Sequence, residues 1–193
     1  MSARRGGRVP GGKEDGANRA PVHTGKGKGL TASGSEDAPI AYRIRGESAT
    51  RKLAGRLAEL LCPGDVVLLV GELGTGKTCF VQGIAEGLGV RERVLSPTFT
   101  LLREYTGRLP LYHLDAYRLE GPGDLSDLGL EEYLEGQGVV VVEWADRVRD
   151  FFAGDCLEVS LCFDEGGEAR RVSLRFRGDS WRVRLPRLRG EKG

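Results

Sequence analysis

The sequence lacks the features that mark a membrane protein, a secreted protein or a strongly charged nucleic-acid binder. No apolar run approaches the length of a transmembrane helix, and no hydrophobic signal-peptide core follows Met1. The formal net charge is only +1 over 193 residues, so the molecule as a whole carries no excess positive charge for nucleic acid or anionic lipid. We therefore expect a cytoplasmic protein that does not enter a membrane.

Paired cysteine motifs are absent as well. The four cysteines (Cys62, Cys79, Cys156 and Cys162) show no C-x-x-C spacing, and three of them lie in apolar surroundings. This usage is typical of reduced, buried thiols in a reducing compartment, rather than of disulfides or a zinc site.

Composition divides the chain into three parts. Residues 1–38 are rich in Gly, Lys and Arg and nearly devoid of apolar side chains, so we expect a disordered N-terminal tail. Apolar periodicity fills residues 39–178, which is long enough for one domain with a substantial core. Residues 179–193 read as a basic C-terminal tail with some strand character over Trp181–Leu185.

The central part alternates between strand and helix patterns. "VVLLV" (66–70) and "VVVVEW" (139–144) are continuous apolar runs of the kind that is buried on both faces of a parallel sheet. Three helices are predicted: one capped by Ser48 with Leu53, Leu57, Leu60 and Leu61 on one face, one over 77–88, and an acidic one over 124–135. The other predicted strands are an edge strand in "APIAYRIRG", two strands in "TFTLLREYTG" and "PLYHLDAYRL", and an antiparallel hairpin of "CLEVSLCF" with "ARRVSLRFRG". Together they predict a three-layer α/β domain with a mostly parallel central sheet and antiparallel additions.

The stretch "GELGTGKT" (71–78) fits G-x-x-x-x-G-K-[ST] in full. Glycines allow successive backbone N–H groups to converge on a phosphate, and the following helix directs its positive N-terminal dipole at the same point. Lys77 would then bridge the β- and γ-phosphates, and the Thr78 hydroxyl would bind Mg²⁺. The motif lies between a predicted strand and a predicted helix, as a P-loop requires. We therefore expect a P-loop NTPase-like domain with ATP and Mg²⁺ as ligands.

A P-loop also needs an acid at the tip of a neighbouring strand to hold or orient the magnesium ion. Glu143 ends "VVVVE", although the usual acid at this position is Asp, and Asp115 ends "LYHLD". Both are candidates, and the sequence leaves open which of them contacts the metal directly.

Four segments occur in an order that resembles the TsaE family, the bacterial P-loop ATPases of threonylcarbamoyladenosine synthesis on tRNA. They are "GELGTGKT", "SPTFTLLREY" (96–105), "LYHLDAYRLEGPGDLSDLGLEEYL" (111–134) and "VVEWADR" (141–147). The similarity spans about residues 40–176. The combination of "SPTFT", "HLDAYR" and "EW" is more specific to the family than the P-loop is.

The resemblance implies a role for each matching residue. Glu143 corresponds to the magnesium-associated acid, Asp115 to an acid important for hydrolysis, and Thr98 and Thr100 to a switch-like segment near the γ-phosphate. The implied nucleotide contacts are Glu47, Gly71, Leu73, Gly74, Thr75, Gly76, Lys77, Thr78 and Cys79. Cys79 departs from the family because a second Thr or Ser is common there.

The resemblance also implies partners. Family members hydrolyse ATP in a complex with the TsaB–TsaD pair, in which TsaD transfers the threonylcarbamoyl group to adenosine at the tRNA anticodon loop. On this interpretation the protein meets tRNA only indirectly, through the complex, and resets or drives that complex.

Three other function classes compete with this interpretation. A P-loop small-molecule kinase is the main alternative, but such enzymes close an arginine-bearing lid over the phosphates, whereas residues 120–138 hold six acids and no Lys or Arg. A GTPase that reads guanine through N-K-x-D is disfavoured because the only asparagine is Asn18. A nucleotide-sensing adaptor without catalysis stays open.

Overall fold

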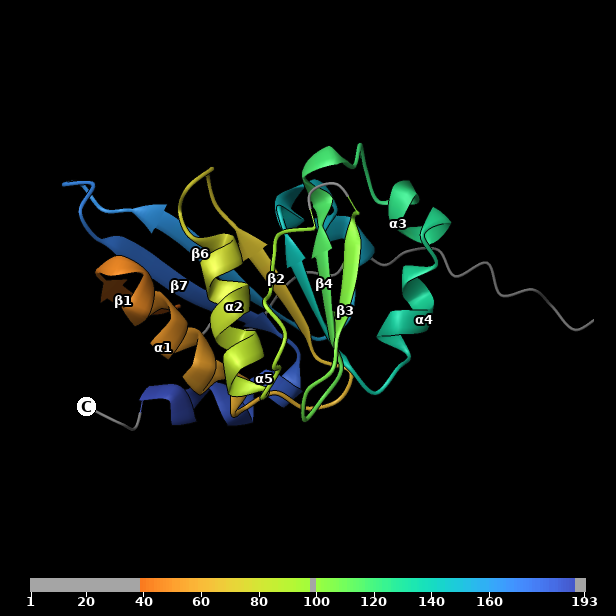
Figure 1. Ribbon diagram of the computed structural model, residues 1–193, viewed down its shortest axis with the longest axis horizontal. Helices are drawn as coiled ribbons and strands as arrows, with labels where there is room; N and C mark the ends of the chain where they lie inside the picture. Colours follow the sequence, from red (N-terminus) through yellow and green to blue (C-terminus); the bar gives the residue numbers. More distant parts are fainter. Residues whose placement is uncertain (1–38, 98–99, 190–193) are drawn as a thin grey trace, which may run out of the picture. The chain divides into compact units, whose positions relative to one another are not determined.

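The structure is a computed structural model that describes residues 39–97 and 100–189 (Figure 1). A single seven-stranded sheet in the order β1-β7-β6-β2-β5-β4-β3 forms its centre. The strands are β1 (Ile40–Ile44), β2 (Val66–Val70), β3 (Leu102–Tyr105), β4 (Leu111–Asp115), β5 (Val139–Glu143), β6 (Cys156–Phe163) and β7 (Arg170–Arg177).

Strand direction divides the sheet into a parallel centre and antiparallel margins. β6, β2, β5 and β4 run parallel to one another, whereas β3 on one side and β7 with β1 on the other are antiparallel additions. The strands of the centre contain the two long apolar runs, and β2 and β5 are buried on both faces. The predicted three-layer α/β fold is thereby confirmed.

Helices cover both faces of the parallel centre. α1 (Gly46–Ala58) and α2 (Lys77–Gly87) lie side by side on one face (Figure 1), where Val67, Leu69, Val139 and Val141 point toward them. On the other face, α3 (Gly123–Asp127) and α4 (Leu130–Leu134) pack on the alternate residues of the same strands. Short 3₁₀ turns complete the connections: η1 (Ala116–Arg118), η2 (Ala145–Arg147), η3 (Arg149–Phe151) and η4 (Leu185–Arg189). No helix in this described part of the chain combines the length and apolar character that a membrane crossing requires.

A glycine allows α1 and α2 to approach each other closely. A Cβ atom at Gly83 would lie 2.5 Å from the Arg51 carbonyl oxygen and 2.7 Å from the Cβ of Ala54. Since Cβ atoms do not approach other atoms so closely, any larger residue at this position would push the two helices apart. The spacing matters because α2 begins at the P-loop lysine.

Several predicted element boundaries are wrong. α1 begins at Gly46, so Ser48 lies inside its first turn rather than at the cap position, which Arg45 occupies. The acidic segment forms two helices, because Gly129 adopts a positive φ of 67° between them. Among the described residues of the predicted strand 98–107, only Leu102–Tyr105 pair as β3, since Leu101 has a φ of 64° in a turn before them.

The C-terminal segment corrects another expectation. Instead of the strand character predicted over Trp181–Leu185, the chain forms the helix α5 (Asp179–Arg184) and continues into η4. Trp181, Leu185 and Leu188 follow the i, i+4, i+7 spacing of one helix face, and all three are buried in the same core as α1 and α2. In this segment Arg alternates with apolar residues, which is typical of a strand. That alternation led to the wrong prediction, because the helical spacing appears only when Leu188 is included.

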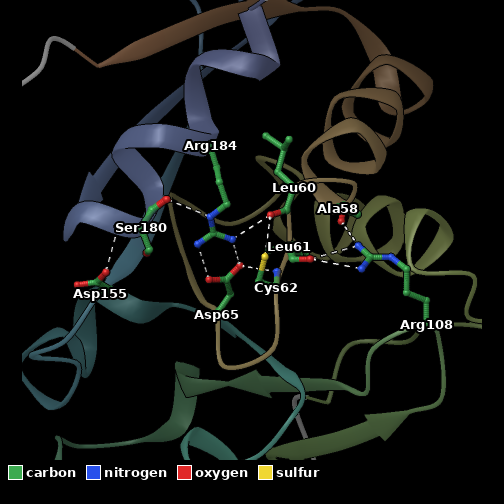
Figure 2. A network of polar contacts seen from close by, with 9 residues as sticks. All are labelled: Ala58, Leu60, Leu61, Cys62, Asp65, Arg108, Asp155, Ser180 and Arg184. Atoms are coloured by element: carbon green, nitrogen blue, oxygen red, sulfur yellow. Dashed lines mark hydrogen bonds and ion pairs between the residues drawn. The ribbon is translucent and has the colours of Figure 1, made fainter.

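Arg184 fastens α5 to the loop that leads into β2 (Figure 2). Its guanidinium donates to both carboxylate oxygens of Asp65, at 2.6 and 2.8 Å, and to the Leu60 carbonyl oxygen at 2.9 Å. Asp65 also accepts a hydrogen bond from the backbone N–H of Cys62. The hydrogen bond with Asp65 is the main reason that the pKa of Arg184 is raised. This pair therefore holds the end of α1, the start of β2 and α5 together.

We expect Arg184→Met to lower the free energy of unfolding by about 2 kcal/mol, because it leaves the nearly buried Asp65 carboxylate without its charged partner. Urea denaturation followed by circular dichroism measures the change. Arg182→Met on the same helix is the matched control: its side chain is exposed and lies 3.8 Å from Asp179, so its expected effect is below about 0.5 kcal/mol. Equal losses in the two variants would contradict a specific role for the Asp65–Arg184 pair.

Candidate active site

The loop between β2 and α2 has the closed shape of a phosphate-binding turn. Gly71 has a φ of 148°, and a Cβ atom there would lie 2.2 Å from the Leu161 carbonyl oxygen, so no other residue fits. The Thr75 hydroxyl donates to the Glu72 carbonyl oxygen at 2.8 Å, and Arg170 on β7 donates to the Thr75 carbonyl oxygen at 2.9 Å. The loop is therefore held from within and from a neighbouring strand.

Lys77 folds back over this loop. Its Nζ donates to the carbonyl oxygens of Gly71 and Glu72 at 2.7 and 2.9 Å, and it lies 3.5 Å from the ring centroid of Trp144. Burial lowers the pKa of Lys77, while the nearby Glu143, Asp115 and Asp146 act in the opposite direction. Neutral carbonyls and an aromatic face thus hold the ammonium group, and an anion in the loop can compete with them for its charge.

Asp115 and Glu143 lie side by side at the carboxyl edge of the sheet. β4 and β5 are parallel neighbours, and the two acids are register partners. Both are buried. Glu143 Oε2 accepts a hydrogen bond of 3.0 Å from the Thr78 hydroxyl. Asp115 accepts from the backbone N–H of Tyr117 at 2.9 Å and from the Ser96 hydroxyl at 3.1 Å.

These groups surround one cavity of about 280 Å³. Most of the predicted site residues line it: Glu47, Leu73, Gly74, Gly76, Lys77, Thr78, Cys79, Asp115 and Glu143. Gly71 and Thr75 belong to the same loop but do not line the cavity. Thr98 lies outside the described residues. Thr100 is exposed in a turn, where its hydroxyl donates to the Pro97 carbonyl oxygen.

Four further residues complete the wall and were missed by the sequence analysis, namely Thr50, Ser96, Trp144 and Arg170. Ser96 and Trp144 lie within the motifs "SPTFT" and "EW", so the signal for both was present. Thr50 on α1 and Arg170 on β7 have no local signal, because they reach the site only through the packing of distant segments. His113, which contacts Glu143, was also not singled out.

The oxygen atoms of Thr78 and Glu143 fit a magnesium ion. Mg²⁺ prefers hard oxygen ligands and is commonly bound by one or two protein groups together with substrate phosphates. Within residues 39–97 and 100–189 there is no cluster of three or more His, Cys, Asp or Glu side chains that would form a metal cage made of protein alone. A hydroxyl and a carboxylate 3.0 Å apart beside a phosphate-binding loop match the shared kind of site.

The predicted burial of the cysteines holds for only one of them. All four are free thiols, of which Cys156 is buried, Cys79 is half-buried, and Cys62 and Cys162 are exposed. Burial raises the pKa of both Cys79 and Cys156. Among the residues that the structure describes, Cys79 is the one thiol that lines the cavity.

Comparisons with known proteins converge on one family. The family model described as threonylcarbamoyl adenosine biosynthesis protein TsaE matches residues 44–172. The chain is 46% identical over 145 residues to the tRNA threonylcarbamoyladenosine biosynthesis protein TsaE of Bacillus subtilis (strain 168), an alignment that covers 75% of this chain and 90% of that protein. It is 54% identical over 109 residues to the protein of the same name from Treponema pallidum (strain Nichols), covering 56% of this chain and 78% of that protein.

A solved structure agrees with the sequence relatives. The crystal structure of YdiB from Bacillus subtilis superposes with a TM-score of 0.69 at 34% sequence identity, covering 80% of this chain and 97% of that chain.

Proposed function

Because this chain belongs to the TsaE family of threonylcarbamoyladenosine biosynthesis proteins, we propose that it is a Mg²⁺-dependent ATPase that acts on a TsaB–TsaD complex during modification of the tRNA anticodon loop. The observation that carries the proposal is the contact between Thr78 and Glu143 beside Lys77 and Asp115, all around one cavity. Such a set supports binding of a nucleotide with its metal and attack on the terminal phosphate. Because the proposed complex modifies tRNA, we expect the protein to act in the cytoplasm.

Phosphate binding depends on the loop and on Lys77. The backbone N–H groups of the loop and the first turn of α2 favour an anion at the helix N-terminus. Lys77 leaves the carbonyl oxygens of Gly71 and Glu72 to contact the β- and γ-phosphates, so its positive charge moves from neutral partners to an anion. Thr78 and Glu143 would hold Mg²⁺, which would neutralise charge on the phosphate oxygens.

Hydrolysis additionally requires a group that orients water toward the γ-phosphate. Asp115 suits this role because it lies beside Glu143 at the same strand edge and its carboxylate is fixed by Ser96 and the Tyr117 N–H. A carboxylate held in this way can accept a proton from an attacking water or orient that water toward the phosphate. The reaction resets or drives the complex, and the threonylcarbamoyl transfer belongs to the partner.

The test is phosphate release from Mg·ATP by the purified protein, alone and with its cognate TsaB–TsaD pair, with Lys77→Ala as the blank. We expect weak release alone and clear stimulation by the pair. Rapid phosphate release at the same rate with and without the pair would contradict the proposed partner. It would favour a small-molecule kinase that transfers phosphate to water when its substrate is absent. Nucleotide binding without hydrolysis under either condition would favour a nucleotide-sensing adaptor.

Cys79 supplies an independent check on where the nucleotide binds. We expect ATP to slow alkylation of Cys79 by N-ethylmaleimide about 10-fold or more, because the thiol lines the cavity and depends on access for its reactivity. Its raised pKa also predicts slower labelling than at the exposed Cys62 and Cys162 at neutral pH, since less thiolate is present. Peptide mapping by mass spectrometry reports all these thiols in one sample, so Cys62 and Cys162 serve as internal controls. Protection spread equally over them would contradict a nucleotide at this cavity.

A further inference from the structure

We propose that His113 is a positioning residue that fixes the magnesium-binding carboxylate of Glu143, an inference that rests on the proposed function. His113 lies on β4, two residues before Asp115, and is fully buried. Its Nε2 is 2.8 Å from Glu143 Oε1, while the other oxygen, Oε2, accepts from the Thr78 hydroxyl at 3.0 Å. Within the Glu143 carboxylate, Oε1 thus contacts the imidazole of His113, and Oε2 lies beside Thr78, where the proposed metal would bind.

The direction of the hydrogen bond follows from the chemistry of the two partners. An ionised carboxylate only accepts hydrogen bonds, so the imidazole Nε2 must carry the hydrogen. His113 Nδ1 is buried and has no hydrogen-bond partner in the described part of the chain. The 2.8 Å contact therefore assigns the Nε2 hydrogen to Glu143 Oε1, and Nδ1 takes no part in it.

Glu143 needs such a contact more than the shorter acid that is usual at this strand end. A glutamate side chain has one more rotatable bond than aspartate, so its carboxylate samples more positions unless a second group holds it. His113 supplies that group from the neighbouring parallel strand, where it pairs in register with Val141 and so points to the same face as Glu143. Outer hydrogen bonds of this kind orient metal ligands, and their loss typically costs about 10–100-fold in metal affinity.

The experiment is a calorimetric titration of ADP into the protein, in EDTA and at increasing Mg²⁺, for wild type and three variants at position 113. In His113→Leu, we expect the Mg²⁺ concentration that gives half of the full increase in ADP affinity to rise at least about 10-fold. The affinity for ADP in EDTA should be unchanged. His113→Gln is the rescue variant, because its amide nitrogen reaches the position of the imidazole Nε2, and its Mg²⁺ requirement should stay within about 3-fold of wild type. His113→Asn carries the same amide on a shorter side chain and should behave like His113→Leu.

A double variant separates positioning from a general packing effect. In a Glu143→Gln background, His113→Leu should not raise the Mg²⁺ requirement further, because His113 acts only through the carboxylate that has been replaced. Equal Mg²⁺ requirements in wild type and His113→Leu, matching behaviour of the Gln and Asn variants, or additive losses in the double variant would each overturn the proposal. Wild-type protein whose ADP binding ignores Mg²⁺ would instead contradict the proposed function.

Discussion

Lys77→Ala is expected to weaken ATP binding by at least 100-fold, or about 2.7 kcal/mol. In the structure the ammonium group contacts the Gly71 and Glu72 carbonyl oxygens and the Trp144 ring. A bound triphosphate replaces these neutral partners with anionic phosphate oxygens, so each hydrogen bond of the ammonium group then joins two opposite charges. Alanine removes that attraction. Isothermal titration calorimetry with ATP measures the affinity directly.

The control for Lys77→Ala is Lys52→Ala on the exposed surface of α1. It removes the same charge from the molecule without touching the cavity, so the ATP affinity should stay within about 2-fold of wild type. Thermal melting of both variants should show that each remains folded. ATP affinity in Lys77→Ala equal to that of Lys52→Ala would remove the argument for a phosphate-binding loop.

Asp115→Asn is expected to reduce ATP hydrolysis in the TsaB–TsaD complex by about 100-fold or more, while ATP affinity changes little. The amide keeps the oxygen that accepts from the Tyr117 N–H, and its NH₂ group can donate to the Ser96 hydroxyl, which turns to accept it. The local structure therefore persists while the negative charge that orients or deprotonates water is lost. Phosphate release at saturating ATP measures the rate of turnover.

Asp146→Asn is the matched control for this substitution. Asp146 is an exposed carboxylate in η2 that influences Lys77 only through space, so its neutralisation should leave turnover within about 2-fold of wild type. If the two asparagine variants hydrolyse ATP at the same rate, the assignment of Asp115 is wrong. A parallel loss of ATP affinity in Asp115→Asn would show instead that the acid supports binding.

The centre of the fold and of the site could be predicted because the signals are local. "VVLLV" and "VVVVE" are apolar enough to require burial on both faces, and parallel strands end at the same edge of a sheet. Asp115 and Glu143, each at such an end, were therefore expected near the glycine-rich loop, and the structure aligns them as register partners. The loop itself follows from its glycines and lysine.

Other parts of the site depend on packing that no short segment encodes. Arg170 reaches Thr75 only because the β6–β7 hairpin has one particular register beside β2. The helix α5 forms because its apolar face covers the core and Arg184 meets Asp65, 119 residues away in the chain. Gly129 divides the acidic segment into two helices because it adopts a left-handed backbone conformation. Composition alone does not reveal whether a glycine will adopt that conformation.

The pairing of β1 with β7 joins two parts of the chain that are far apart in sequence. β1 is the first strand in the described part of the chain, yet it lies at the sheet margin beside β7, with Ile40 opposite Leu174. Contacts this distant in sequence form slowly, since a long loop must close before they contribute stability. Until β1 arrives, β7 presents an unpaired edge that can recruit a strand from another molecule. We therefore expect β1, once it pairs, to protect the β7 edge from pairing with another molecule.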